Sequence, residues 1–298
     1  MPHDLPRVLL SARVFLGQAS VARADNLEAL AHFGESGAIH EFLRTAREEG
    51  CGGLMTLGDE CVVEALKLMR SSDPGGFQVL PIIPNVPGYV REATEYGLPG
   101  AGLRRLTRAG PGAFLRAALT GLLRAPRVLR RDFAALLAVL CEIEMGEFHQ
   151  FAPPVVFLHH QMTDMALCFG RRALFEEFCG AMRSRFKTEP GLVTSNFALL
   201  APRLTEWDID VSLIAAPLNR ENFLMPGGLN AYRACLASGR FRLVADRIAP
   251  ESPSSRNAVD WAASQEGVEA VVVEKALEPS PLRPRREMGA DDSESREG

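Results

Sequence analysis

The stretch that decides the fold reads Val155-Val156-Phe157-Leu158 and runs directly into His159-His160. Four large apolar residues in a row are typical of a strand in a parallel sheet that is buried on both faces. Similar runs recur along the chain, with expected bounds of 8–16, 53–57, 78–83, 155–158, 191–194, 211–215, 241–246 and 270–274. The sequence therefore predicts eight parallel strands.

Segments with a helical spacing of apolar residues separate these strands, for example 61–70 and 173–185. Eight strands alternating with helices close into a barrel, so the predicted fold class is α/β, a single parallel (β/α)8 TIM barrel over residues 1–278. An open doubly wound sheet is the alternative, but no Gly-x-Gly-x-x-Gly turn follows the first strand to favour it. Residues 279–298 combine Pro, Gly, Ser and mixed charge and predict a disordered tail.

The composition fits a globular protein with a large core. The 298 residues suit one barrel, and 47% of them are hydrophobic and 23% charged. A net charge of -4 argues against a dominant nucleic-acid role. The six cysteines form no Cys-x-x-Cys pair and no signal segment precedes the first strand, which indicates a cytoplasmic setting. Apolar runs are interrupted before the roughly 20 residues that span a bilayer, so no transmembrane segment is predicted.

The connection between the third and fourth strands, residues 84–154, predicts a helical, Arg-rich insertion. We expect helices over 113–123 and 132–144, separated at Ala125-Pro126 because proline disfavours a helical residue before it. Residues 97–131 contain eight arginines and no Asp or Glu. Three interpretations remain open: packing helices with solvated arginines, a lid over the barrel mouth that attracts an anionic ligand, or a contact surface for a membrane or a protein.

Polar residues end the fourth and fifth strands, where His159-His160 and Ser195-Asn196-Phe197 follow the apolar runs. In α/β barrels the carboxyl ends of the strands line the active site, so these side chains should meet at the barrel mouth. Together with the runs 209–219 and 258–273, they give the chain a likeness to a known family. Over roughly residues 155–273 the sequence resembles the aldo-keto reductases.

The resemblance implies reduction of a carbonyl group with NADP or NAD as cofactor. In that family a His after the fourth strand helps to polarise the substrate carbonyl, and by position this is His160, with His159 as its neighbour. A Ser-Asn pair after the fifth strand holds the nicotinamide carboxamide, which corresponds to Ser195 and Asn196. Lys275 follows the eighth strand, where the family's chain approaches the cofactor phosphate.

The family also carries an Asp and a Tyr after the second strand and a Lys after the third. The second strand is followed by Gly58-Asp59 and the third by Pro84-Asn85, so the Tyr and the Lys are missing from those places. Asp59 is either a catalytic candidate near the mouth or the N-cap of the helix that begins at Cys61, and the cap is the interpretation we favour.

Four other residues after strand ends are candidates for substrate contact: Asn85, Tyr89, Asn219 and Arg220. Tyr89, like Tyr96, could supply a displaced phenol or pack under the insertion, and Asn219 with Arg220 could contact an anionic ligand or brace a loop. A metal site on His159, His160 and Asp164 is not predicted, because adjacent strand residues point to opposite faces. By the same reasoning His159 is expected to face the helical shell.

Two classes of function follow. The first is an enzyme that acts on a carbonyl or hydroxyl group of a small, anionic substrate at the barrel mouth, by nicotinamide-dependent reduction or by a non-redox lyase or isomerase reaction. The second is a non-catalytic barrel that binds a ligand or a protein. We favour the enzyme because polar residues stand at several strand ends.

Overall fold

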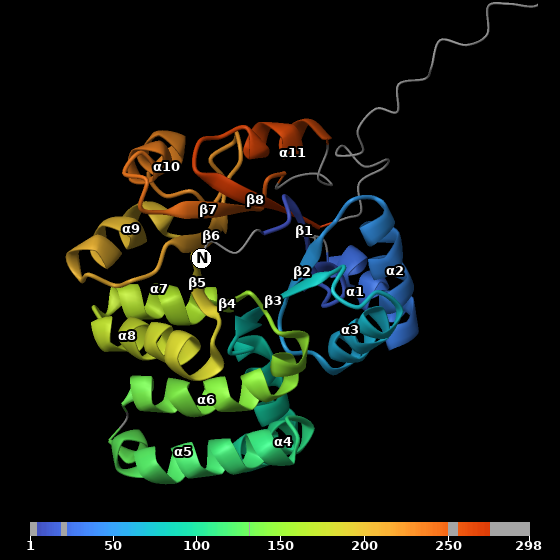
Figure 1. Ribbon diagram of the computed structural model, residues 1–298, viewed down its shortest axis with the longest axis vertical. Coiled ribbons are helices and arrows are strands. Elements are labelled where there is room, and N and C mark those ends of the chain that lie inside the picture. The colour runs from blue at the N-terminus through green and yellow to red at the C-terminus, as the bar shows by residue number, and fades with distance from the viewer. Residues whose placement is uncertain (1–4, 19–22, 131, 250–255, 275–298) are drawn as a thin grey trace, which may run out of the picture.

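Eight parallel strands form one closed barrel in the order of the chain (Figure 1). The computed structural model describes residues 5–18, 23–130, 132–249 and 256–274. The strands are β1 (Val8–Ser11), β2 (Gly53–Thr56), β3 (Gln78–Ile83), β4 (Val155–Leu158), β5 (Glu189–Val193), β6 (Leu213–Pro217), β7 (Arg242–Asp246) and β8 (Val268–Val273). β8 pairs in parallel with β1 and closes the barrel, so the predicted fold class is confirmed.

Alternate residues of each strand serve two apolar layers. In β4, Val155 and Phe157 point into the barrel interior, whereas Val156 and Leu158 pack under the helices. The Phe157 ring lies close to the backbone of β5, where a Cβ added to Gly191 would lie 2.6 Å from it. Glycine at 191 therefore makes room for the ring that fills the barrel.

The helices surround the barrel in chain order. They are α1 (Arg23–His32), α2 (Ser36–Glu48), α3 (Glu60–Ser72), α4 (Val86–Arg108), α5 (Pro111–Leu129), α6 (Phe133–Phe148), α7 (His160–Cys168), α8 (Arg172–Ala181), α9 (Phe197–Glu206), α10 (Gly228–Leu236) and α11 (Arg256–Ala263). Short turns are η1 (Ala12–Val14), η2 (His149–Phe151) and the π-type η3 (Met182–Phe186). Among the described residues, no helix has both the length and the apolar character needed to cross a bilayer.

The predicted insertion between β3 and β4 is confirmed and consists of α4, α5 and α6. Helix α6 packs against both α5 and α8, so it occupies the position of an ordinary barrel helix in the shell. In Figure 1, α5 lies outside α6, and the kinked α4 leads into it from β3. Helices α4 and α5 therefore form a layer that is additional to the ordinary helical shell of the barrel.

Buried ion pairs join α4 to α6. Arg105 Nε lies 2.8 Å from Glu92 Oε2, and its Nη1 lies 2.8 Å from Glu144 Oε1. The guanidinium also stacks on Tyr89, with 3.8 Å between Cζ and the ring centroid. Arg105 is only 3% exposed, so the interpretation of solvated arginines is wrong for this residue. Burial raises the pKa of Glu144 to about 7 although Arg105 opposes the shift.

The fifth, sixth and eighth strands differ from their expected bounds by one or two residues at each end, and two larger differences have a physical reason. The helix break at Ala125-Pro126 is wrong, because α5 continues through Pro126 to Leu129. Proline removes one hydrogen bond to Leu122, four residues earlier, and both residues are exposed, so water can hydrate the free carbonyl. The first strand ends at Ser11 instead of residue 16, where the Ser11 side chain accepts a hydrogen bond from the Arg13 backbone and a short 3-10 turn begins.

Candidate active site at the barrel mouth

A cavity of about 320 Å³ lies at the carboxyl ends of the strands, and residues from or just after all eight strands line it. Its apolar floor is the top layer of the barrel interior, formed by Met55, Ile82, Val193 and Val272. Polar and charged residues form the wall, namely Ser11, Arg13, Gln18, His159, His160, Thr194, Ser195, Asp246 and Arg247. An apolar pocket with a few convergent polar groups at this face of a barrel is the expected place for an active site.

Arg13 crosses one side of the mouth and joins three strands. Its Nη1 and Nη2 lie 2.8 Å and 2.5 Å from the two oxygens of Asp246, the last residue of β7, and its Nε lies 2.9 Å from Glu274, directly after β8. Burial would raise the pKa of Asp246, but the Arg13 guanidinium lowers it overall, so this carboxylate is charged. A bidentate pair of this kind fixes both side chains in orientation.

His159 and His160 both line the cavity, so the expectation that His159 faces the helical shell is wrong. The reason is that β4 ends at Leu158 and α7 begins at His160, so the alternation of a strand no longer applies. His159 is the N-cap residue, and its Nδ1 accepts a hydrogen bond from the Gln161 backbone at 3.3 Å. The two ring centroids are 4.3 Å apart.

Both histidines are neutral near pH 7. Burial lowers the pKa of His159 to about 3, and the neighbouring His160 adds to the shift. Because its Nδ1 accepts a hydrogen bond, the single ring proton of His159 must be on Nε2, which makes that nitrogen a donor. Desolvation in the cavity also lowers the pKa of His160, with Asp164 opposing and Arg247 and Arg13 reinforcing the change.

The end of β5 is held in place by α7. Asp164 of α7 accepts hydrogen bonds from the Thr194 hydroxyl and, at 3.1 Å, from the Ser195 backbone. Ser195 lines the cavity, as the prediction for a cofactor-binding residue requires. Asn196 is half-buried at the N-cap of α9, its backbone donates to the Thr194 hydroxyl at 2.9 Å, and it is not among the residues that line the cavity.

Arg247 follows Asp246 and completes the charged side of the mouth. Its backbone has a φ of 47°, in the left-handed region that non-glycine residues rarely adopt, and its N–H donates to Asp246 at 2.8 Å. The side chain lines the cavity. Within the described residues its guanidinium has no carboxylate partner, unlike that of Arg13.

Three of the predicted site residues serve the folding of the chain near the mouth and do not line the cavity. Asp59 is the N-cap of α3 and accepts a hydrogen bond from the Cys61 backbone at 3.1 Å, which is the role favoured from the sequence. Asn85 caps α4 and donates to the Gly58 carbonyl at 2.8 Å. Tyr89 lies against the guanidinium of Arg105.

The two candidates after β6 do not line the cavity either. Asn219 is fully buried, and its side chain makes hydrogen bonds to Phe223 and Arg247 that brace the loop. Arg220 is exposed, with its guanidinium 5.4 Å from the Trp261 ring centroid. Lys275 and the tail 279–298 lie outside the described residues. The described part of the chain contains no cluster of His, Cys, Asp and Glu suited to a metal ion.

Sequence reasoning missed Arg13, Asp246, Glu274 and Arg247. The position of Arg13 at the mouth was not predicted, because the expected first strand extended through this residue. The strand in fact ends two residues earlier, at Ser11. Asp246 and Glu274 are the last residues of the expected seventh and eighth strands, so their position at the mouth was a usable signal. No described residue of α4, α5 or α6 lines the cavity, so the structure does not support the lid interpretation.

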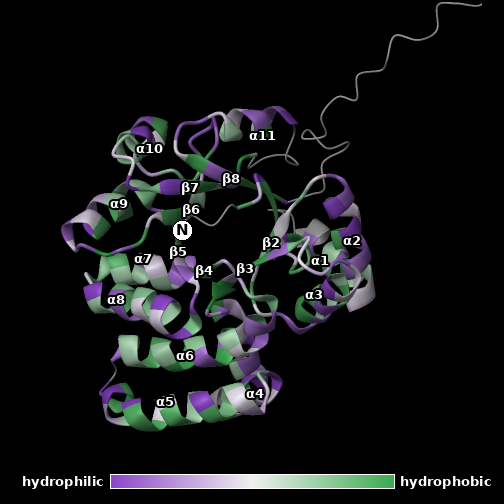
Figure 2. Ribbon diagram, viewed as in Figure 1, coloured by the Kyte–Doolittle hydropathy of each residue, from purple (hydrophilic) through white to green (hydrophobic). Residues whose placement is uncertain are grey.

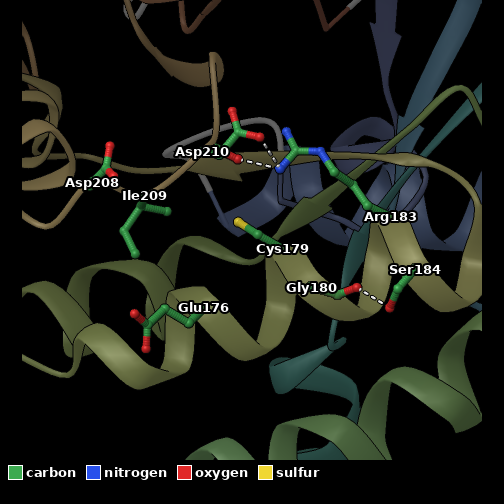
Figure 3. A pocket seen from close by; sticks show the side chains of 8 residues that line it. All are labelled: Glu176, Cys179, Gly180, Arg183, Ser184, Asp208, Ile209 and Asp210. Carbon is green, nitrogen blue, oxygen red and sulfur yellow. Dashed lines mark hydrogen bonds and ion pairs between the residues drawn. The ribbon is translucent and has the colours of Figure 1, made fainter.

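A second pocket, of about 450 Å³, is shallow (Figure 3). Its residues precede β5 and β6 along the chain, so it lies at the amino ends of the strands, away from the mouth. It is formed by the end of α8 and the segment that enters β6. Arg183 is bound there to the carbonyl and the carboxylate of Asp210, at 2.6 Å and 2.9 Å. Burial raises the pKa of the Cys179 thiol to about 12, so it is protonated and a poor nucleophile. The face before the strands supports stability in such barrels, and this pocket fits that role.

Comparison with known proteins agrees with the fold. No protein-family profile matches the chain, and no curated protein sequence is similar to it. The chain is similar to a crystal structure from Pseudomonas aeruginosa, described as a candidate aldo-keto reductase, with a TM-score of 0.52 and 11% sequence identity. The similarity covers 91% of this chain and 84% of that chain. It shows that the two chains share the parallel α/β-barrel fold.

Proposed function

We propose that the chain is an enzyme that acts on a carbonyl or hydroxyl group of a small anionic compound in the mouth cavity. The observation that carries the proposal is the pair of neutral histidines in the cavity wall, opposite a fixed cluster of charged residues. A neutral imidazole can donate a proton or a hydrogen bond to one oxygen and accept from another. The cavity volume of about 320 Å³ favours a substrate of few atoms.

The roles we assign follow from the hydrogen bonds of each residue. His159, with its proton on Nε2, donates a hydrogen bond to the substrate oxygen. His160 is the acid-base group, because its ring reaches the solvent and its lowered pKa keeps it unprotonated near pH 7. Arg247 binds the anionic group of the substrate, since its guanidinium has no ion-pair partner among the described residues.

NADPH or NADH is the cofactor we propose to test first, and it would supply hydride when bound. Ser195 supports the proposal, because a hydroxyl in the cavity wall can hold the carboxamide of a nicotinamide ring. The backbone of Ser195 is fixed by Asp164, so this hydroxyl is presented from a rigid support. We also propose a cytoplasmic location, which the six unpaired cysteines support.

A titration of the dialysed protein with NADPH and NADH, followed by fluorescence, tests the redox proposal. We expect saturable binding that Ser195→Ala weakens and that Ser184→Ala, a serine of the second pocket, leaves unchanged. Absence of binding by the unmodified protein would eliminate nicotinamide-dependent reduction. Screening NADPH oxidation with small aldehydes and 2-oxo acids would then define the substrate class.

A non-redox lyase or isomerase is the second candidate. It is favoured by the absence of any tyrosine among the described residues of the cavity wall, because the family's reduction step uses a tyrosine as proton donor. Proton transfer at a carbon next to a carbonyl group needs only the histidines and the arginines. Exchange of substrate hydrogens with deuterated water, measured by NMR on the same 2-oxo acids, would distinguish this reaction.

His160→Gln tests the role of the acid-base group in either reaction. We expect activity to fall by about 10²–10⁴-fold with an unchanged melting temperature. His149→Gln, at an exposed histidine outside the cavity, is the matched control. A large loss of stability with unchanged ligand binding would remove His160 from the site and leave a non-catalytic barrel as the better explanation.

A further inference from the structure

Helix α5 presents its largest apolar side chains to the solvent. We name these residues the α5 outer face, and they are Phe114, Leu115, Leu119, Leu122, Leu123 and Leu129, with exposures from 42% to 84%. In Figure 2 the outermost helix is coloured largely green along its length, with purple segments between. A contiguous exposed apolar surface of this kind marks a contact site.

The opposite face of α5 consists of small residues that pack on α6. Ala113, Ala117 and Thr120 are buried there. The two helices approach so closely that a Cβ added to Gly146 of α6 would lie 2.4 Å from the Cβ of Ala113. Rotating α5 to bury its leucines would force the helices apart, so their outward position follows from the packing of small residues.

All formal charges on α5 are positive, since the helix contains no Asp or Glu. Arg116 and Arg127 are about half exposed, although Arg127 is paired with Asp132, and Arg130 is exposed directly after the helix. The partner of Arg116 is Glu142, which is only 2% exposed, so the solvent meets the cation and not its counter-ion. Arg130 has no ion pair within the part of the chain that is described.

We propose that the α5 outer face binds to the surface of an anionic lipid bilayer, with the helix parallel to the membrane. Leucine and phenylalanine on one face, with arginines beside them, is the arrangement of helices that lie in the headgroup region. The arginines match anionic lipids and contribute about a fivefold gain in binding each, from about 1 kcal/mol per basic residue near such a surface. Neither of the two pockets described above is lined by a described residue of α5, so neither would hold a partner helix or strand on this face.

A second copy of the chain fits this face less well. In a symmetric contact the same patch meets itself, and the arginines of both copies would be brought together; the helix has no carboxylate of its own, and Asp132 beside it is already paired with Arg127. The lipid occupant avoids this repulsion. The cavity stays open to substrate in the bound state, because no described residue of α5 lines it.

Flotation of the full-length protein with vesicles tests the proposal. We expect binding to vesicles of equal parts phosphatidylcholine and phosphatidylglycerol, little binding to phosphatidylcholine alone, and release by high salt. Leu119→Glu and Leu122→Glu should each weaken binding by more than tenfold. Leu199→Glu, at a leucine of α9 that is 62% exposed, is the matched control and should bind normally. Arg130→Gln should weaken binding about fivefold, and Arg203→Gln on α9 should not.

A tryptophan probe reports contact without reducing the apolar surface. The emission of Leu122→Trp should shift to shorter wavelength on the mixed vesicles, and that of Leu199→Trp should not. Absence of binding to both vesicle types would overturn the proposal, as would binding that the α5 variants leave unchanged. A dimer in solution that Leu122→Glu dissociates would also overturn it and assign the face to a second copy.

Discussion

Arg13 and Arg105 are two arginines that each lie between two carboxylates, yet their surroundings differ. Arg105 is 3% exposed and joins Glu92 to Glu144 inside the insertion, and it lines neither of the two pockets described above. The Arg13 side chain is 20% exposed and lines the mouth cavity while it binds Asp246 and Glu274. The comparison teaches that a buried ion pair alone does not identify a functional site. Access to a cavity distinguishes the two.

We expect the largest effect on stability from a substitution that removes Arg105 from its ion pairs. Arg105→Met leaves Glu144 buried without its cation and leaves Glu92 with Arg108 alone, and we expect the free energy of unfolding to fall by about 3–5 kcal/mol. Chemical denaturation measures the loss. Arg104→Met removes an exposed arginine from the adjacent position and should stay within about 0.5 kcal/mol of the parent. Equal losses in the two variants would contradict the structural role of Arg105.

Arg13→Met is the matching change at the mouth, and we expect a smaller loss of about 2 kcal/mol, because solvent screens the remaining carboxylates. Ligand affinity should fall with this variant and stay unchanged in Arg105→Met, if that variant is folded. The double variant Arg13→Met/Asp246→Asn should regain part of the stability, since it removes one of the two unpaired carboxylates. A fully additive loss in denaturation experiments would exclude the coupling between the two residues.

The lowered pKa of His159, a residue of the cavity wall, predicts that the stability of the protein depends on pH. The folded protein has a pKa of about 3 at this residue, and the unfolded chain has the ordinary value of about 6.5. Between these values only the unfolded chain binds the proton, so stability should fall as the pH is lowered, by up to about 1.4 kcal/mol per pH unit. His159→Gln should flatten the slope, and His149→Gln should retain it. An unchanged slope in His159→Gln would show that other groups cause it.

We expect the smallest effect on stability from substitutions at Asp59. They distinguish a carboxylate that caps a helix from one that takes part in catalysis. Asp59→Ala should lower stability by about 1 kcal/mol through the loss of the hydrogen bond to the Cys61 backbone, while Asp59→Asn keeps most of it. Activity should be the same in both variants. Asp73→Ala, at the other end of α3, is the control for removing a surface carboxylate. Loss of activity in Asp59→Asn with normal stability would restore the catalytic role.

Local patterns were sufficient to predict the barrel and part of the site. Apolar runs predicted eight parallel strands, and residues directly after two strands, His159, His160 and Ser195, do line the cavity. The position of a residue after a strand is a local property, so these could be found from the sequence.

The remaining site depends on contacts between distant parts of the chain. Arg13 is defined by partners at the end of β7 and directly after β8, which no spacing around residue 13 reveals. Asn85 and Asn219 also follow strands, but their amides are occupied by a helix cap and by loop carbonyls. Only three-dimensional proximity distinguishes such a bracing amide from one that is free to bind a ligand.

The neighbouring positions of β3 and β4 have a consequence for the order of folding. Ile82 pairs with Phe157 and Ile83 with Leu158, although three helices separate them along the chain. Closing a long loop costs little extra entropy, about 0.6 kcal/mol for each doubling of length, but contacts between distant residues form slowly. We expect the β3–β4 pairing to gain amide protection later than β6–β7 in pulse-labelled hydrogen exchange. The chain would then fold as two arcs of strands, β1–β3 and β4–β8, which join late at the seam that the insertion spans and at β8–β1, where Val8 pairs with the still more distant Val271.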